Sequence, residues 1–182
     1  MNHNTIFRPL IVFAIPVLIL VALAIPPFWT TMFGEEIKIK TAPIDPTDLF
    51  RGSYVALGYE IESVALDQLD ETVMTDFKSK YAGDYKNVYV TLQQGDDGQY
   101  NVDYVSKEKP EKALYLKGKL QIPYDLESAS SIHIKYGLDN FYAPKEKAME
   151  LEKSVSAKPA WAIVKVKNGN AVLKEIIVPK DK

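Results

Sequence analysis

Hydrophobic and polar positions follow two different patterns along this chain. From Pro9 to Trp29 no position carries a charge. At a rise of about 1.5 Å per residue, a helix of that length covers the roughly 30 Å hydrocarbon core of a bilayer. Beyond Trp29 the chain is charged and rich in turns, and its apolar residues mostly alternate with polar ones, as in half-buried strands. The pattern predicts a membrane-spanning helix followed by a β-rich domain.

The alternation predicts several strands. We expect them around residues 37–39, 88–92, 100–104, 114–116 and 132–136. The second and third of these would pair across the turn at 95–98. The clearest hairpin joins 161–167 to 171–178, because Asn168-Gly169 between them favours the positive φ angles of a type I′ turn. These pairings predict a mostly antiparallel sheet.

Two segments break the alternation and predict short helices. Apolar residues recur at helical spacing from Leu66 to Phe77, with Ser63 as a possible cap. Pro144 suits the first turn of a second helix that carries an apolar face from 148 to 155. We therefore predict a β-rich α+β domain in which two short helices cover a mostly antiparallel sheet. The pattern leaves open whether that sheet closes into a barrel.

The flanks of the apolar block predict its orientation. Arg8 is the only Lys or Arg before the block, and residues 30–36 carry no positive charge, so the N-terminus should be cytoplasmic and the remainder extracytoplasmic. The alternative is a cleaved signal peptide, for which Ala22-Leu23-Ala24 offers a small-x-small site. We favour the anchor because the apolar character continues to Trp29, and we expect Pro26-Pro27 to end the helix. The predicted organisation is a cytoplasmic N-terminus (1–8), a transmembrane anchor (9–29) and an extracytoplasmic domain (30–182).

Composition excludes several function classes. The segment from Thr30 onward holds all 24 acidic residues and every one of the 22 basic residues except Arg8, a net charge of −3, which argues against binding of nucleic acid. The chain has no cysteine, so disulfides and thiolate chemistry are excluded. His3 precedes the apolar block and His133 falls on the outer face of a predicted strand, which leaves no histidine pair for a metal or a catalytic triad. We expect no catalytic residue, no metal ligand and no cofactor.

The most specific local chemistry begins with a turn. Asp45, Pro46 and Asp48 fit a capped helical turn, because Asp45 accepts hydrogen bonds from free N–H groups and Pro46 has the φ angle of a first turn. Arg51 follows, one of two arginines in a chain with twenty lysines. Its guanidinium either pairs with Asp45 or Asp48 to fix the turn or is an exposed contact for a partner carboxylate or a lipid phosphate.

A strand should follow this turn. Leu57 and Tyr59 fall on the face that we assign to the core, with the Tyr59 hydroxyl satisfied at its edge. Tyr54 falls on the other face, beside the small residues at 56 and 58, which would leave a shallow trough.

The segment Gly52-Ser53-Tyr54-Val55-Ala56-Leu57-Gly58-Tyr59 resembles the motif after which the GDYXXLXY family is named. The likeness covers most of the domain and extends to residues 136–137, 141–142, 144, 151–152 and 164–173. The chain departs from the family pattern at Ser53, where Asp is usual, and at Lys145, where Glu is expected. No obligatory carboxylate role is carried over to either position.

The resemblance implies a single anchor, an extracytoplasmic domain, frequent association with a multi-spanning membrane protein, and no established activity. The motif-based candidates for binding are Arg51, Gly52, Ser53, Tyr54, Leu57, Tyr59, Phe141 and Tyr142, with Asp45, Pro46 and Asp48 as a structural turn. We therefore expect a single-pass protein of the cell membrane that acts as an interaction module on such a partner. An exposed aromatic patch would mark this function.

Two other function classes stay open. An extracytoplasmic sensor of a small molecule or cell-wall ligand would need a concave pocket lined by aromatic residues and a few convergent polar groups. A hydrolase would need a nucleophile with a buried lysine, and Ser53 with Lys117 or Lys119 is the available combination. The neighbours of both lysines give no sign of burial, so the hydrolase is the weakest of the three.

Overall fold

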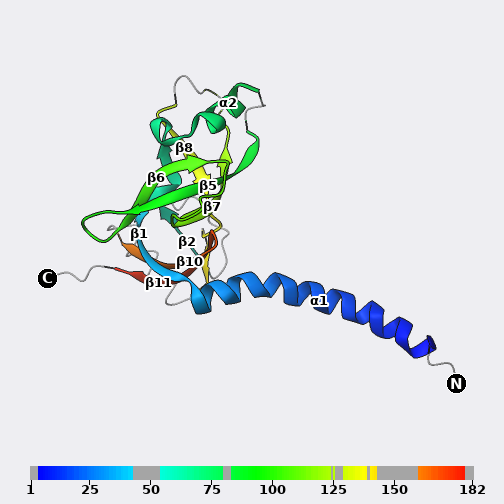
Figure 1. Cartoon of the computed structure of the whole chain (residues 1–182). Coiled ribbons are helices and arrows are strands. Elements are labelled where there is room, and N and C mark those ends of the chain that lie inside the picture. Colours follow the sequence, from blue (N-terminus) through cyan, green and yellow to red (C-terminus); the bar gives the residue numbers. More distant parts are fainter. Residues whose placement is uncertain are drawn as a thin grey trace.

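The computed structural model describes residues 4–42, 54–79, 83–123, 125, 129–138, 140–142 and 160–178. A long helix, α1, projects from a domain built mainly of strands (Figure 1). All pairings between the named strands are antiparallel. The fold is therefore the β-rich α+β arrangement that the alternating pattern predicts.

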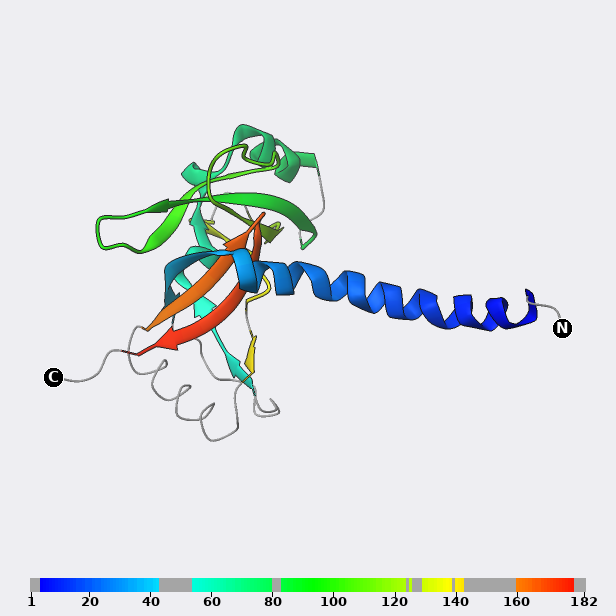
Figure 2. The same ribbon diagram turned by 60° about the horizontal axis from the view of Figure 1, so that its bottom comes forward.

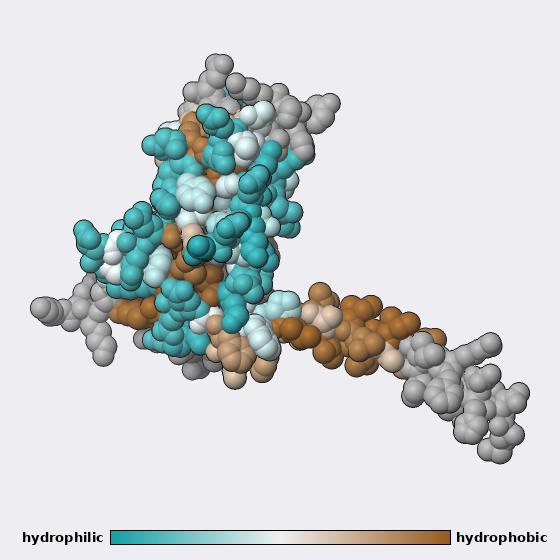
Figure 3. Space-filling view, viewed as in Figure 1, coloured by the Kyte–Doolittle hydropathy of each residue, from teal (hydrophilic) through white to brown (hydrophobic). Residues whose placement is uncertain are grey.

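Helix α1 spans Asn4–Phe33 and contains the predicted apolar block. Its segment Val12–Phe33 is long and apolar enough to cross a membrane, and every residue of it except Thr30 is exposed. The surface is apolar along this helix and mostly hydrophilic over the domain (Figure 3). Exposed aromatic side chains lie near its C-terminal end, among them Trp29 and Phe33.

The expectation that Pro26-Pro27 ends the helix is wrong, because α1 continues to Phe33. A proline has a φ angle compatible with a helix and lacks only the hydrogen bond that its own N–H would donate. The helix can therefore continue beyond it when neighbouring groups satisfy the freed carbonyls. The hydroxyls of Thr30 and Thr31 donate hydrogen bonds of 2.9 Å to the carbonyls of Pro26 and Pro27, which keeps these polar groups satisfied within the helix.

The helix passes into the first strand without a linker. Gly34 donates its N–H to the Thr30 carbonyl at 2.8 Å, and strand β1 (Glu35–Ala42) begins at the next residue. The last carbonyls of a helix lack partners within it and carry a partial negative charge. Here Lys165 Nζ donates to the Thr31 carbonyl at 2.8 Å and Lys167 Nζ to the Phe33 carbonyl at 3.3 Å. The domain therefore holds the end of α1 directly.

The first sheet has the strand order β11-β10-β1-β3. Its other strands are β3 (Gly58–Tyr59), β10 (Trp161–Lys167) and β11 (Asn170–Ile177). The predicted hairpin is confirmed, since Asn168 and Gly169 join β10 to β11 with φ angles of 51° and 77°. This sheet carries the contacts to α1, as Figure 2 illustrates.

The second sheet has the order β4-β8-β7-β5-β6. Its strands are β4 (Ser63–Ala65), β5 (Tyr85–Gln94), β6 (Tyr100–Ser106), β7 (Tyr115–Gln121) and β8 (Ser131–Lys135). The predicted pairing of 88–92 with 100–104 is confirmed in the β5–β6 hairpin. Strands β2 (Tyr54–Ala56) and β9 (Asn140–Tyr142) form a separate two-stranded sheet. In the described part of the chain, both larger sheets are open.

The helix predicted from Leu66 begins later than its apolar spacing suggests. Ser63 is a strand residue of β4 rather than a cap, because β4 pairs with β8. Short 3₁₀ turns cover Glu60–Glu62 and Leu66–Gln68, and helix α2 runs from Glu71 to Ser79. Asp70 caps α2, since its carboxylate accepts the N–H of Thr72 at 3.1 Å. The second predicted helix, from Pro144, lies outside the described residues.

One hydrophobic core joins the two larger sheets. The first sheet contributes Ile37, Ile39, Val164 and Val166, and the second contributes Val88, Val90, Leu116, Leu120 and Ile134. Along most of these strands the core positions alternate with half-buried or exposed ones, which is why the sequence pattern located them.

Candidate functional site

The structure brings together the two sequence blocks that contain the candidate binding residues. Strands β2 and β9 pair with Tyr54 opposite Tyr142 and Val55 opposite Phe141. We call this pair of strands the β2–β9 ribbon. Figure 2 shows the ribbon as the cyan and yellow strands, apart from both larger sheets. Three of the candidate positions, 54, 141 and 142, are therefore neighbours in space.

Two further candidates belong to the core. Leu57 and Tyr59 have exposed fractions of 2% and 1%, so neither side chain is accessible to a partner. The prediction that both face the core is confirmed. Gly58 between them is also buried and pairs with Ala42 of β1, so no surface trough extends to this position.

Two tyrosine hydroxyls connect the two sequence blocks. Tyr59 of the first block donates to the carbonyl of Leu138 at 3.0 Å, and Tyr136 of the second block donates to the carbonyl of Ile61 at 2.8 Å. The Tyr59 ring is buried and the Tyr136 ring is partly buried, and each hydroxyl satisfies the carbonyl of a buried residue as well as itself. This reciprocal pair fixes the segment 57–61 against 136–138, directly before β9.

A buried carboxylate supports the same region. Glu62 has an exposed fraction of 8%, and its Oε2 accepts the backbone N–H of Tyr59 at 3.3 Å. Burial raises the pKa of the Tyr136 hydroxyl, and the negative charge of Glu62 raises that pKa further. The sequence pattern does not identify Glu62 or Tyr136 as site residues, because the alternation of apolar and polar positions does not indicate which polar side chain faces inward.

A scan against protein-family models matches residues 16–176 to the GDYXXLXY protein family. The chain belongs to the GDYXXLXY family. The match includes most of α1, both tyrosine-linked blocks and the β10–β11 hairpin. Comparisons with curated proteins and with solved structures give no match.

Some candidates of this GDYXXLXY protein lie outside the described residues. These are the binding candidates Arg51, Gly52 and Ser53 and the turn residues Asp45, Pro46 and Asp48. Whether Arg51 pairs within the turn or contacts a partner therefore stays a prediction.

The two lysines of the hydrolase hypothesis are not buried, and Ser53 lies outside the described residues. Lys117 and Lys119 are both exposed on β7, whereas a general-base lysine needs burial to lower its pKa. His133 is exposed on β8, as predicted. Among the described residues, no group of three His, Cys, Asp or Glu side chains is placed to hold a metal ion.

Proposed function

We propose that this GDYXXLXY protein is a single-pass membrane protein whose extracytoplasmic domain docks on a multi-spanning membrane protein. An apolar helix of sufficient length and the single flanking Arg8 support the anchor and its orientation. The extracytoplasmic domain is then held at the membrane surface.

The observation that carries this proposal is the junction between α1 and β1. A domain that only needed to stay near the membrane could hang on a flexible linker. Here the helix enters the sheet directly, and two lysines of β10 hold its last turn. A domain fixed in this way presents one constant set of surfaces to the membrane plane. That arrangement favours a binding partner that is itself embedded in the membrane.

The β2–β9 ribbon is the surface that we assign to docking. A two-stranded sheet is marginally stable in water by itself, so packing against a further surface would stabilise it. It carries aromatic residues at 54, 141 and 142, the residue type that dominates the binding energy of interfaces. Leu57 and Tyr59 are then supports that position the ribbon from the core.

The test is co-purification of the tagged full-length chain from native membranes in mild detergent. We expect one stoichiometric multi-spanning protein to be retained, and Tyr54→Ala or Tyr142→Ala to reduce its retention about 5- to 30-fold, as for an interface hot spot. Tyr104→Ala, at a tyrosine that is 41% exposed on β6, is the matched control and should retain the partner.

Thermal unfolding separates docking from folding in these variants. Full retention by Tyr54→Ala and Tyr142→Ala, with a lower melting temperature, would assign the ribbon a purely structural role. Recovery of the unmodified chain alone in several detergents would contradict the docking function.

A further inference from the structure

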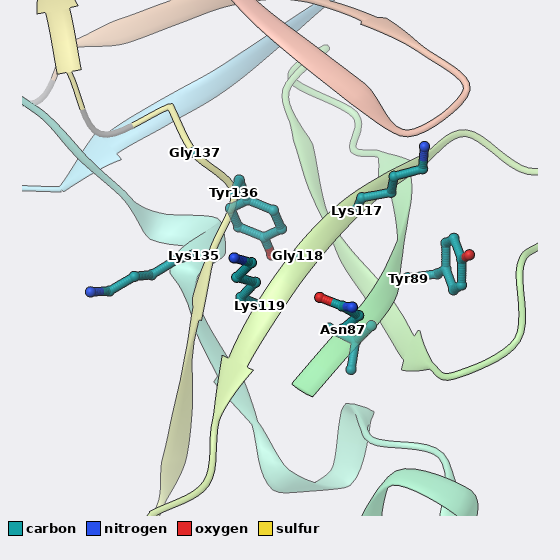
Figure 4. A pocket seen from close by; sticks show the side chains of 9 residues that line it. Asn87, Tyr89, Lys117, Gly118, Lys119, Lys135, Tyr136 and Gly137 are labelled. Atoms are coloured by element: carbon teal, nitrogen blue, oxygen red, sulfur yellow. The ribbon is translucent and has the colours of Figure 1, made fainter. Parts of the chain in front are cut away.

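A second surface of the domain has the form of a ligand site. A groove of about 550 Å³ lies on the five-stranded sheet, and none of its lining residues belongs to the β2–β9 ribbon. Its lining consists of Asn87, Val88 and Tyr89 of β5, Lys117, Gly118 and Lys119 of β7, and Lys135, Tyr136 and Gly137 at the end of β8. Figure 4 shows these side chains around the three adjacent strands. Small-molecule sites commonly measure about 300–1,000 Å³.

The floor and the open side of the groove follow from the strand pattern. Val88 and Gly118 are paired, and the Val88 side chain is buried in the core on the opposite face, so backbone forms the floor here. Gly137 has a φ of 75°, and a Cβ atom there would meet nothing within 4 Å, which leaves this side open. A glycine is needed at position 118 for packing in the core, because a Cβ atom there would lie 2.5 Å from Ile134 Cγ2.

The strand register places positive charges next to one another in this groove. Lys119 lies directly opposite Lys135, and Lys117 is two residues away on the same face of β7. Like charges opposite each other on antiparallel strands are destabilising. The lining contains three lysines and no Asp or Glu, although the chain as a whole has a net charge of −2.

The described residues offer these lysines little compensation. Lys117 Nζ lies 3.5 Å from Asn170 Oδ1, and Lys135 Nζ lies 5.8 Å from the centre of the Tyr85 ring. Lys119 has no hydrogen bond or ion pair with any residue that the structure describes. An anion bound between the strands would remove the repulsion between Lys119 and Lys135.

We propose that this groove binds a small phosphate-bearing molecule. A phosphate monoester carries a charge of about −1.5 to −2 at pH 7, which matches two ammonium groups, and lysine is a common phosphate ligand. Lys119 and Lys135 take the phosphate. Tyr89, opposite Lys117, and Asn87, opposite Lys119, provide a ring face and an amide for the rest of the molecule. The site is independent of the proposed docking function, and its ligand is a soluble phosphate ester or a phosphate on a lipid headgroup.

The experiment uses the full chain in a phosphate-free detergent, with phenyl phosphate and inorganic phosphate as probes and chloride at equal ionic strength as the reference. We expect both phosphates to raise the melting temperature saturably by several degrees, with phenyl phosphate effective at lower concentration. Calorimetric titration should give one site per chain. No shift beyond that of chloride would overturn the soluble-ligand form of the proposal.

Charge-reversal variants locate the site. Lys119→Glu should abolish the phosphate-dependent shift, while the ligand-free protein melts at the same or a higher temperature, because Glu at 119 would attract Lys135. Lys119→Gln removes the charge without reversing it and should weaken the shift. Lys112→Glu makes the same charge change at an exposed position outside the groove and should keep the full shift. An undiminished shift in Lys119→Glu would overturn the assignment.

Nanodiscs containing phosphatidic acid distinguish a phosphate on a lipid headgroup from a phosphate on a soluble ester. A Lys119-dependent shift with this lipid alone would place the phosphate on a headgroup, and a shift with phenyl phosphate would place it on a soluble molecule. The absence of a Lys119-dependent shift in both arms would overturn the phosphate site altogether.

Discussion

At the scale of single residues, tyrosine hydroxyls connect distant parts of this chain. The hydroxyls of Tyr59 and Tyr136 donate to carbonyls of the opposite sequence block. A buried carbonyl without a donor costs about 1–3 kcal/mol, so each of these bonds matters more than its net strength suggests. The motif tyrosine at 59 is thus primarily a structural residue.

The raised pKa of Tyr136 predicts a loss of stability at alkaline pH. Above pH 10.0, its ordinary pKa, Tyr136 ionises in the unfolded chain but keeps its proton in the folded protein. The folded state then binds more protons, so the free energy of unfolding falls as the pH rises. Tyr136→Phe should be about 1–3 kcal/mol less stable at pH 8 and show a shallower decline toward pH 11 in urea titrations. Parallel declines for the two proteins would refute this role.

Two glycines with the same backbone conformation make a matched test of packing. Gly137 and Gly169 have φ angles of 75° and 77°, so alanine is strained at both. A Cβ at 137 would meet nothing within 4 Å, whereas one at 169 would lie 2.4 Å from the ring of Tyr115. Gly169→Ala should lose about 1–3 kcal/mol more stability than Gly137→Ala. Equal losses in chemical denaturation would show that the clash at Tyr115 is relieved.

At the scale of elements, the junction of α1 with the first sheet gives the molecule its distinctive geometry. Each lysine near a helix C-terminus stabilises the helix by about 0.3–1 kcal/mol. Exchanging both Lys165 and Lys167 for Gln should therefore speed hydrogen exchange at the Gly34 amide about 3- to 30-fold.

The control for this junction lies on the neighbouring strand. Lys174 of β11 pairs with Glu36 at 2.7 Å, and this hydrogen bond raises the pKa of the lysine, whereas the last carbonyls of α1 accept hydrogen bonds from Lys165 and Lys167 instead. Lys174→Gln should leave exchange at Gly34 unchanged. If the double variant also exchanged at the original rate, the lysines would not hold the helix.

Local sequence patterns predicted most strands of this fold, but they did not predict which strands pair with one another outside the hairpins. Alternation located β1, β5 and β6, and Asn168-Gly169 located the last hairpin, because these signals depend on adjacent residues. The single strand predicted to contain Tyr54, Leu57 and Tyr59 is instead divided into β2 and β3, and a 3₁₀ turn follows β3. The break occurs because β2 pairs with β9 and β3 pairs with β1, a long-range choice that adjacent residues do not encode.

The candidate sites have the same limitation. Sequence comparison with the family named both blocks of the ribbon, yet only the register places Tyr54 opposite Tyr142. The sequence does not indicate that Lys119 and Lys135 are neighbours, and only the β7–β8 register places them opposite each other. Strand pairing, which is long-range, therefore determines both sites.

At the scale of the whole molecule, the account requires the domain to lie outside the cytoplasm. The chain has no cysteine, so single cysteines report topology without background. Asp97→Cys, at the exposed tip of the β5–β6 hairpin, should react with a membrane-impermeant maleimide on intact cells. Asn4→Cys, at the start of α1, should react only after the membrane is opened. The reverse pattern would invert the proposed orientation.

Docking on a membrane protein is the central claim, and site-specific photo-crosslinking in native membranes tests it most directly. A photoreactive phenylalanine analogue replaces Tyr54, Tyr142 or, as the control, the exposed Tyr104 of the full-length chain. The account predicts that positions 54 and 142 crosslink to the same multi-spanning protein and that position 104 does not. No crosslink from the ribbon, or equal crosslinking from all three positions, would contradict docking through the β2–β9 ribbon.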